Sequence, residues 1–250
     1  MKVSVITVCR NAGAEIDATL RSVLMQDHAD IEHIVIDGAS TDDTLARVKR
    51  YAECIAHLVS EPDEGVYDAM NKGLRLATGE VIAFVNAGDM LARRDVATRM
   101  VQAFEHTGAD AVYGDALMVD PVNITRVKRF WKGGVFDRAA FRRGWMPPHL
   151  GTWVRRAVYE AHGGFRTELR VAADYELLLR FMYVNRIRVH YEPVAVVRFR
   201  LGGVSNRSLA HIWRANREVY KAWAMNGERI SPFIAVLKPL RKLAQYFQRA

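Results

Sequence analysis

The stretch EVIAFVNAGD, residues 80–89, passes from a continuous apolar segment straight into an Asn, two small residues and a carboxylate. A short apolar run of this kind is typical of a strand that is covered on both faces. A strand that ends in this way forms either a plain turn or the floor of a binding site. The segments on both sides of it are needed to choose between the two.

Strand-like and helix-like segments alternate through the first half of the chain. In chain order we expect a strand at 3–8, a helix containing Ile16, Leu20, Val23 and Leu24, a strand at 33–38, a helix at 40–52, a strand at 54–60, a helix at 65–79 that stops at Gly79, and the strand at 80–85. This alternation predicts an α/β fold with a mostly parallel, doubly wound sheet and right-handed crossovers.

The regular alternation of strand-like and helix-like segments ends after residue 108. Strands are expected at 109–119, 126–130 and 188–200, and a helix is expected at 173–184. The sequence contains neither an internal repeat nor a low-complexity linker. We therefore predict a single domain over residues 1–225 with an elaborated, mixed second half, followed by a C-terminal tail over residues 226–250.

The bulk composition narrows the class of protein. Half of the 250 residues are hydrophobic, which supplies a core, and the net charge of +8 points to an anionic partner. The two cysteines, Cys9 and Cys54, are too few for a disulfide scaffold and lack metal-binding spacing. No signal peptide and no apolar run of roughly 18 residues, the length that spans a bilayer, is found. We therefore expect a cytoplasmic protein.

Carboxylates follow several of the expected strands. Asp37 and Asp89 come directly after two of them, and Asp63 and Glu64 lie in the loop after a third. Ligands of an open parallel sheet bind at the carboxyl ends of the strands, although Asp, Asn and Gly are also good turn residues. A carboxylate that holds a divalent cation can neutralise a pyrophosphate there. Neither a G-x-G-x-x-G loop nor a G-K-[ST] P-loop is present, which disfavours a Rossmann dehydrogenase and a P-loop NTPase.

Five motifs together resemble the family 2 glycosyltransferases of the GT-A fold. They are VSVITVCRNA, EIDATLRSVLMQ, HIVIDGASTDDT, DEGVYDAMNKGLRLATGEVIAFVNAGD and ADYELLLRF, and they fall in the order typical of the family over roughly residues 2–205. The resemblance implies an inverting, hexosyltransferase-type enzyme that uses a nucleotide-diphosphate sugar donor and Mg²⁺ or Mn²⁺. It implies a saccharide or lipid-linked acceptor in cell-surface polysaccharide or glycolipid biosynthesis.

The resemblance also assigns site residues. The nucleotide-sugar-binding positions that it implies are Cys9, Asn11, Asp37, Asp68, Lys72, Asn86, Ala87 and Gly88. Of these, Asp37 would hold the base of the nucleotide. Lys72 would meet phosphate, and Asp68, four residues earlier on the same helix face, would contact the donor or orient the lysine. The alternative for this pair is an ordinary surface ion pair.

The metal ligands that the resemblance implies are Asp89 and His149. The sequence departs from the family pattern here, because Gly88 replaces the first Asp of the usual Asn-x-Asp-Asp. In the same way DGAS, residues 37–40, replaces the commoner Asp-Asp-Gly-Ser. One carboxylate with diphosphate oxygens and waters binds Mg²⁺ more weakly than two. A lone His is often structural, which is the alternative for His149.

An inverting transfer needs a base that takes the proton of the acceptor hydroxyl. Asp174 matches the base of the family at the start of a helix, where the helix dipole favours an ionised carboxylate. The alternative for Asp174 is a helix N-cap, and Glu176 is the rival base. Arg198 and Arg200 precede a glycine-containing loop and could reach phosphate when it closes, or could be a solvated strand end.

The C-terminal tail has apolar residues on one helical face and Lys and Arg on the other. This pattern is typical of a helix at an anionic membrane interface, and equally of a helix that packs on protein. The runner-up function is a catalytically weak sugar-nucleotide-binding or membrane-scaffold protein of the same fold, which the weakened NAGD motif favours. A nucleic-acid binder would rest on charge alone, since no RNA-binding signature is present. We expect no nucleic-acid partner.

Overall fold

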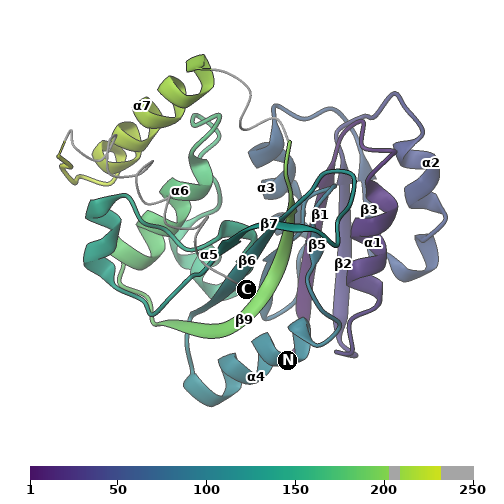
Figure 1. Cartoon of the computed structure of the whole chain (residues 1–250), viewed down its shortest axis with the longest axis horizontal. Helices are drawn as coiled ribbons and strands as arrows, with labels where there is room; N and C mark the ends of the chain where they lie inside the picture. The colour runs from purple at the N-terminus through teal and green to yellow at the C-terminus, as the bar shows by residue number, and fades with distance from the viewer. Residues whose placement is uncertain (203–208, 232–250) are drawn as a thin grey trace.

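The computed structural model describes residues 1–202 and 209–231. Its first half forms the parallel part of the sheet, as the sequence predicts. The elements are β1 (Val3–Cys9), α1 (Ile16–Leu24), β2 (Ile31–Asp37), α2 (Thr44–Lys49), η1 (Ala52–Cys54), β3 (His57–Ser60), α3 (Val66–Leu76) and β4 (Val81–Phe84). The strands pair in parallel in the order β3-β2-β1-β4 (Figure 1).

The second half extends this sheet with strands of both directions. Its elements are β5 (Met90–Leu91), α4 (Val96–Thr107), β6 (Ala111–Val119), β7 (Val127–Trp131), η2 (Arg138–Arg143), η3 (His149–Gly151), β8 (Thr152–Arg155), α5 (Arg156–His162), α6 (Ala173–Leu178), η4 (Leu179–Val184), β9 (Val189–Arg200) and α7 (Leu209–Met225). Across the described residues the full order is β3-β2-β1-β4-β8-β6-β9-β5, and β7 pairs with β6. β8 is antiparallel to its neighbours, which confirms a mostly parallel, mixed sheet.

Helices cover both faces of the sheet because each buried strand sends alternate side chains to opposite sides. Ile6 and Phe84 pack on one face with residues of α3, α5, α6 and α7. Val5 and Ala83 pack on the other face with α4, and Val35 packs there with α1 and α2. In Figure 1, α1 and α2 lie to the right of the sheet, and α6 and α7 lie to the left.

Three helices differ from their predicted extents. α2, expected at 40–52, spans only Thr44–Lys49. α3 ends at Leu76, so Gly79 does not terminate it. Gly79 is instead required by close packing, because a Cβ there would lie 2.6 Å from the backbone nitrogen of Ser4. The helix expected at 173–184 is α-helical only to Leu178 and continues as a π-helix over Leu179–Val184.

The buried carboxylate of Glu32 connects β1, β2 and the segment after α3. Glu32 is 5% exposed and accepts hydrogen bonds from Lys2 Nζ at 2.8 Å, Thr78 N at 2.8 Å and the Ser4 hydroxyl. Burial alone would favour the protonated carboxyl group, but these donors outweigh it and hold the pKa of Glu32 at about 2.

We expect Glu32→Gln to lower the free energy of unfolding at pH 7 by about 3 kcal/mol. Because the pKa is depressed in the folded state, the stabilisation is present above the unfolded value near 4.5 and is lost as the pH falls toward 2. Urea unfolding between pH 7 and pH 2.5 measures this. The variant curve should be flatter over that range, whereas Glu105→Gln, an exposed position on α4, should match the wild type. Parallel wild-type and Glu32→Gln curves would contradict the assignment.

The predicted C-terminal helix lies largely outside the described residues, since only 226–231 of the tail are described. Within the described ranges, no helix has the length and apolar character that crossing a membrane requires.

Candidate active site

Four strand ends come together at one edge of the sheet. The register places Cys9 of β1 beside Asp37 of β2, and Asp37 beside Ser60 of β3. β4 lies on the other side of β1 and leads directly into the NAGD turn. The loops that follow these strands therefore form a common surface at the carboxyl edge, where an open α/β sheet binds its ligand.

Asp37 is fully buried at this edge, with 0% exposure. Its carboxylate accepts hydrogen bonds from the backbone nitrogen of Ser40 at 3.1 Å and from the Ser60 hydroxyl at 2.7 Å, and the Ser40 hydroxyl donates to it as well. The Cys9 thiol lies 3.7 Å away, and burial together with the Asp37 charge raises the pKa of this thiol. A nucleotide base that contacts Asp37 must displace one of these donors.

Asn11 connects the loops that follow β1 and β2. Its backbone has a φ of 47°, in the left-handed region that Asn tolerates better than most residues. Its side-chain oxygen accepts a hydrogen bond from Thr41 N at 2.8 Å, and its own backbone nitrogen donates to the Ser40 hydroxyl at 2.8 Å. Asn11 therefore shapes the rim of the site.

Asp63 is a further site candidate. The sequence places it in the loop after a strand but assigns it no role. One of its oxygens accepts a hydrogen bond from Gly65 N at 2.9 Å. The other lies so close to Gly38 that a Cβ on this glycine would be 2.1 Å from it. Gly38 stands where the family commonly has a second Asp, so the Asp63 carboxylate fills the space that this side chain would need. Gly38 and Asp63 are 25 residues apart in the chain, so only the packing of their two loops shows that the Asp63 carboxylate occupies this space.

Asp68 and Lys72 both bind the loop that leads into α3. Asp68 accepts a hydrogen bond from Glu64 N at 3.1 Å, as an acidic side chain in the first turn of a helix commonly does. The Lys72 ammonium donates to the Pro62 carbonyl at 2.6 Å and lies 2.9 Å from a Glu61 oxygen and 3.7 Å from Asp68. The Glu61 contact raises the pKa of Lys72. Lys72 must exchange these partners to reach a phosphate.

The NAGD segment is a tight turn fastened to α1. Gly88 has a φ of 96°, which side-chain-bearing residues rarely adopt. The Thr19 hydroxyl accepts from Gly88 N at 3.0 Å and donates to the Asp89 carbonyl at 2.7 Å. The backbone nitrogen of Ala87 bonds to Val8 of β1 at 3.0 Å. The missing Asp at position 88 therefore coincides with a backbone conformation suited to glycine.

Asp89 is held from the other side by β9. One of its carboxylate oxygens accepts from Arg200 N at 3.0 Å. Burial raises the pKa of Asp89 to about 7, against the opposing effect of Arg200. The Arg200 guanidinium donates to the carbonyls of Gly88 at 3.3 Å and Pro121 at 3.1 Å, and Arg198 donates to the Ile124 carbonyl at 3.3 Å. Both arginines thus hold loops at the rim.

The turn offers oxygen donors that suit a hard divalent cation. The side-chain oxygen of Asn86 is buried and has no hydrogen-bond partner in the described part of the chain, and the Asp89 carboxylate lies three residues on. Mg²⁺ and Mn²⁺ prefer such carboxylate and amide oxygens. Within residues 1–202 and 209–231, however, no group of three or more His, Cys, Asp and Glu side chains is placed to hold a metal. The remaining ligands would have to come from a diphosphate and water.

His149 lies among aromatic rings. Its ring centroid is 5.9 Å from that of Phe84 and 5.5 Å from that of Phe165. Burial lowers the pKa of His149, and the charge of nearby Asp174 opposes this only in part. Burial therefore favours the neutral form of His149, and the charge of Asp174 is near enough to act on its ring.

Asp174 is the second residue of α6. Its Oδ1 accepts from Tyr175 N at 2.8 Å and lies 3.2 Å from the Tyr67 hydroxyl. Within the described ranges, no hydrogen bond from the protein reaches Oδ2. One side of this carboxylate is thus oriented by the protein, and the other is available to a substrate proton. Tyr67, on α3, is a site residue that sequence reasoning missed.

Glu176, the rival base, has a different environment. It is 0% exposed and forms a two-point ion pair with Arg180, with oxygen-to-nitrogen distances of 2.9 and 3.1 Å. Arg166 and Asn226 also bind its Oε1, at 3.3 and 3.0 Å. With its oxygens occupied and buried, Glu176 has a structural role.

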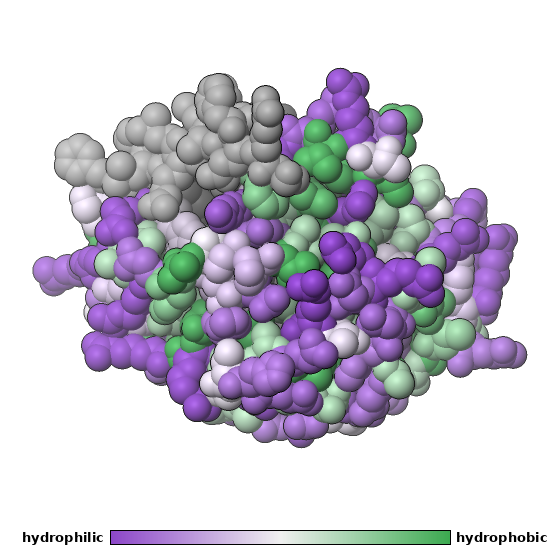
Figure 2. All heavy atoms as spheres, turned by 60° about the horizontal axis from the view of Figure 1, so that its bottom comes forward, coloured by the Kyte–Doolittle hydropathy of each residue, from purple (hydrophilic) through white to green (hydrophobic). Residues whose placement is uncertain are grey.

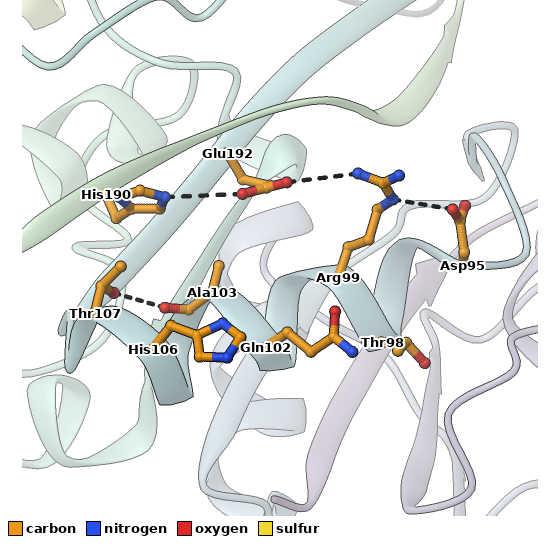
Figure 3. A pocket seen from close by; sticks show the side chains of 9 residues that line it. All are labelled: Asp95, Thr98, Arg99, Gln102, Ala103, His106, Thr107, His190 and Glu192. Carbon is orange, nitrogen blue, oxygen red and sulfur yellow. Dashed lines mark hydrogen bonds and ion pairs between the residues drawn. The ribbon is translucent and has the colours of Figure 1, made fainter.

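A groove of about 600 Å³ lies elsewhere, between α4 and the first part of β9 (Figure 3). Arg99 bridges Asp95 and Glu192 along it, and Glu192 also faces His190 at 3.8 Å. β9 runs in the same direction as β4, so its first residues lie at the amino end of the sheet, opposite the strand ends described above. Figure 2 turns the bottom of Figure 1, where α4 lies, toward the viewer, and hydrophilic side chains predominate on that face. The groove therefore contains none of the site residues that the sequence predicts.

Comparisons with known proteins agree with the fold. The sequence model described as Glycosyl transferase family 2 matches residues 4–162. A PGL/p-HBAD biosynthesis glycosyltransferase of Mycobacterium bovis is 35% identical over 211 residues, which cover 81% of this chain and 78% of that protein. An uncharacterized glycosyltransferase of Mycobacterium tuberculosis is 31% identical and covers 87% of this chain and 92% of its own.

Solved structures show the same architecture. TarS of S. aureus in complex with UDP superposes with a TM-score of 0.68 at 20% identity, over 98% of this chain and 72% of TarS. Mannosyltransferase PcManGT of Pyrobaculum calidifontis, in complex with GDP-Man and Mn²⁺, has a TM-score of 0.67 at 26% identity, over 94% and 68% of the two chains. The chain therefore belongs to glycosyl transferase family 2 and is a nucleotide-sugar-dependent glycosyltransferase with the GT-A fold.

Proposed function

We propose that this protein transfers one sugar, with inversion at the anomeric carbon, from a nucleotide-diphosphate sugar to a hydroxyl of a saccharide or lipid-linked acceptor. The observation that carries the proposal is Asp174, whose Oδ1 is held by Tyr175 N at 2.8 Å while Oδ2 receives no hydrogen bond from the described residues. A carboxylate oriented in this way suits a general base.

In the proposed reaction, Asp174 Oδ2 takes the proton of the acceptor hydroxyl as its oxygen attacks the anomeric carbon. The bond from that carbon to the diphosphate oxygen breaks on the opposite face, and the nucleoside diphosphate leaves. The charge of Asp174 acts on the buried imidazole of His149, whose ring packs edge-on against that of Phe165.

The donor is proposed to lie along the carboxyl edge of the sheet. The loops around Asn11, Asp37 and Asp63 would surround the nucleoside, and the α3 entrance with Asp68 and Lys72 would face the phosphates. TarS has been solved with UDP-GlcNAc and PcManGT with GDP-Man, which supports a uridine or guanosine donor here. Uracil and guanine both carry a ring N–H that can donate a hydrogen bond to a carboxylate such as that of Asp63.

A divalent cation would be held by Asp89, with the Asn86 oxygen nearby, and would neutralise charge on the departing diphosphate. The Mn²⁺ in the PcManGT complex supports this part of the proposal. The protein side of such a site is sparse, so we expect donor and metal to bind together.

The acceptor is proposed to be a glycolipid or its precursor at the cytoplasmic face of the membrane. The Mycobacterium bovis relative is a PGL/p-HBAD biosynthesis glycosyltransferase, which supports this class. The basic, amphipathic pattern of the tail at 226–250 supports contact with anionic lipid.

We expect Asp89→Asn to weaken binding of the metal-donor complex by roughly tenfold or more, because it removes the charged ligand, and loss of even an outer-shell partner typically costs about 10–100-fold in metal affinity. Thermal-shift titrations with UDP-GlcNAc, GDP-mannose and a dTDP-sugar, each with Mn²⁺, Mg²⁺ or EDTA, measure it. Glu160→Gln, an exposed position on α5, serves as the control.

A metal-dependent shift with one donor, reduced in Asp89→Asn and unchanged in Glu160→Gln, would support the proposed donor site. A shift that survives both EDTA and the substitution would remove the cation from the proposal. The absence of a shift with every donor would favour the scaffold alternative that Gly88 suggests.

A further inference from the structure

Glu218 lies in the middle of α7 and is the single acidic residue of that helix. It is 9% exposed and faces away from solvent, toward the segment that leads into α6. A buried carboxylate is costly unless strong donors satisfy its oxygens. The identity of those donors is therefore informative.

Three successive backbone N–H groups supply them. Glu218 Oε1 accepts from Arg170 N at 3.2 Å, and Oε2 accepts from Val171 N at 2.7 Å and from Ala172 N at 2.9 Å. Hydrogen bonds to an ionised carboxylate are shorter and stronger than those between neutral groups. The carboxylate thus fixes the path of the chain immediately before α6, which begins at Ala173.

Tyr67 of α3 also contacts this segment. Its hydroxyl lies 3.0 Å from the Val171 carbonyl and 3.2 Å from Asp174 Oδ1. α7 also contacts α6 itself, since Trp223 Nε1 donates to the hydroxyl of Tyr175, the residue after Asp174, at 3.0 Å. α7 and α3 therefore both hold the loop, two to four residues before Asp174.

We infer that Glu218 is a positioning residue for Asp174, so that α7 sets the direction of the base. The inference rests on the proposed function, in which Asp174 is the base. Moving a reacting group by about 1 Å can lower a rate by about 100-fold while the substrate still binds. The Glu218 contacts are to backbone, so their loss shifts the whole start of α6.

The test measures hydrolysis of the donor selected by the thermal-shift panel, UDP-GlcNAc or GDP-mannose, with water as acceptor. We expect Glu218→Ala to lower kcat by about 10–100-fold with the donor KM within about twofold of wild type. Glu218→Gln keeps one acceptor oxygen, so its kcat should lie between that of the wild type and that of Glu218→Ala. Glu228→Gln, 39% exposed just beyond α7, is the matched control and should behave as wild type.

Two further measurements separate positioning from general destabilisation. Amide hydrogen exchange at residues 170–172 should be faster in Glu218→Gln than in Glu228→Gln. In an Asp174→Asn background, Glu218→Ala should add no further loss of kcat, because both act through one group.

The possible outcomes are distinct. Unchanged kcat in Glu218→Ala with an inactive Asp174→Asn would overturn the inference and leave the proposed function intact. An active Asp174→Asn would overturn both. A loss of kcat in Glu218→Ala that adds in full to that of Asp174→Asn would assign Glu218 a structural role only.

Discussion

Asp174→Asn is expected to lower the turnover number by about 10³-fold and to leave donor affinity unchanged. General bases contribute roughly 10²–10⁴-fold to enzymatic rates. The amide oxygen of Asn can still accept the hydrogen bond that Tyr175 N gives to Asp174 Oδ1 at 2.8 Å. The substitution therefore keeps the geometry of the start of α6 and removes only the ability to take a proton.

Release of nucleoside diphosphate measures turnover, and calorimetric titration of the donor measures affinity. Asp137→Asn is the matched control, because Asp137 also accepts a backbone hydrogen bond at a helix start, from Ala139 N, but lies on the surface at 52% exposure. It should retain wild-type turnover. An Asp174→Asn variant that keeps more than about a tenth of the activity would be incompatible with a general-base role.

The fold of the first half is predictable because its signals are local. Each of the four parallel strands is a short apolar run, and each is followed by a turn and a segment with helical spacing. These features predict parallel strands with right-handed crossovers, whereas the order β3-β2-β1-β4 is known only from the structure. The mixed second half follows from the change of rhythm, but the pairing of β5 with β9 does not, because it joins residues about a hundred positions apart.

The sequence predicts which strand ends meet at one edge of the sheet, but it does not predict the contacts that their side chains make there. Strand ends point to the carboxyl edge, yet the sequence cannot tell that Asp37 is saturated by two serines or that Asp63 fills the space beside Gly38. Gly79 illustrates the same limit. As a glycine at the end of a helical pattern it predicts a helix stop, but contact with Ser4 of β1 explains it.

Tyr67 and Glu218 were missed for a physical reason. Each is an ordinary member of an amphipathic helix pattern, and its role arises from which backbone atoms it meets across the fold. Glu218 contacts residues 46–48 positions earlier in the chain, and Tyr67 contacts Asp174 across 107. No periodicity or spacing rule encodes such contacts.

The ion pair between Glu176 and Arg180 allows the two candidate bases, Asp174 and Glu176, to be told apart by a measurement of stability. Arg180 is 7% exposed and also donates to the carbonyls of Gly163 at 3.0 Å and Gly164 at 2.6 Å, and to that of His162. Removing one partner of a buried pair leaves an unpaired charge in the core, which typically costs about 3–5 kcal/mol. The chain offers an exposed pair of the same residue types and the same spacing, Arg156 and Glu160.

We expect Glu176→Gln to lower the free energy of unfolding by about 3 kcal/mol, near the lower end of that range because the amide keeps one acceptor for Arg180. Glu160→Gln should change it by no more than about 0.5 kcal/mol, as for exposed helical pairs. Urea unfolding measures both. At a temperature where Glu176→Gln stays folded, its turnover per folded molecule should remain within about threefold of wild type, since Asp174 is intact. A stable Glu176→Gln variant with turnover as low as that of Asp174→Asn would instead make Glu176 the base.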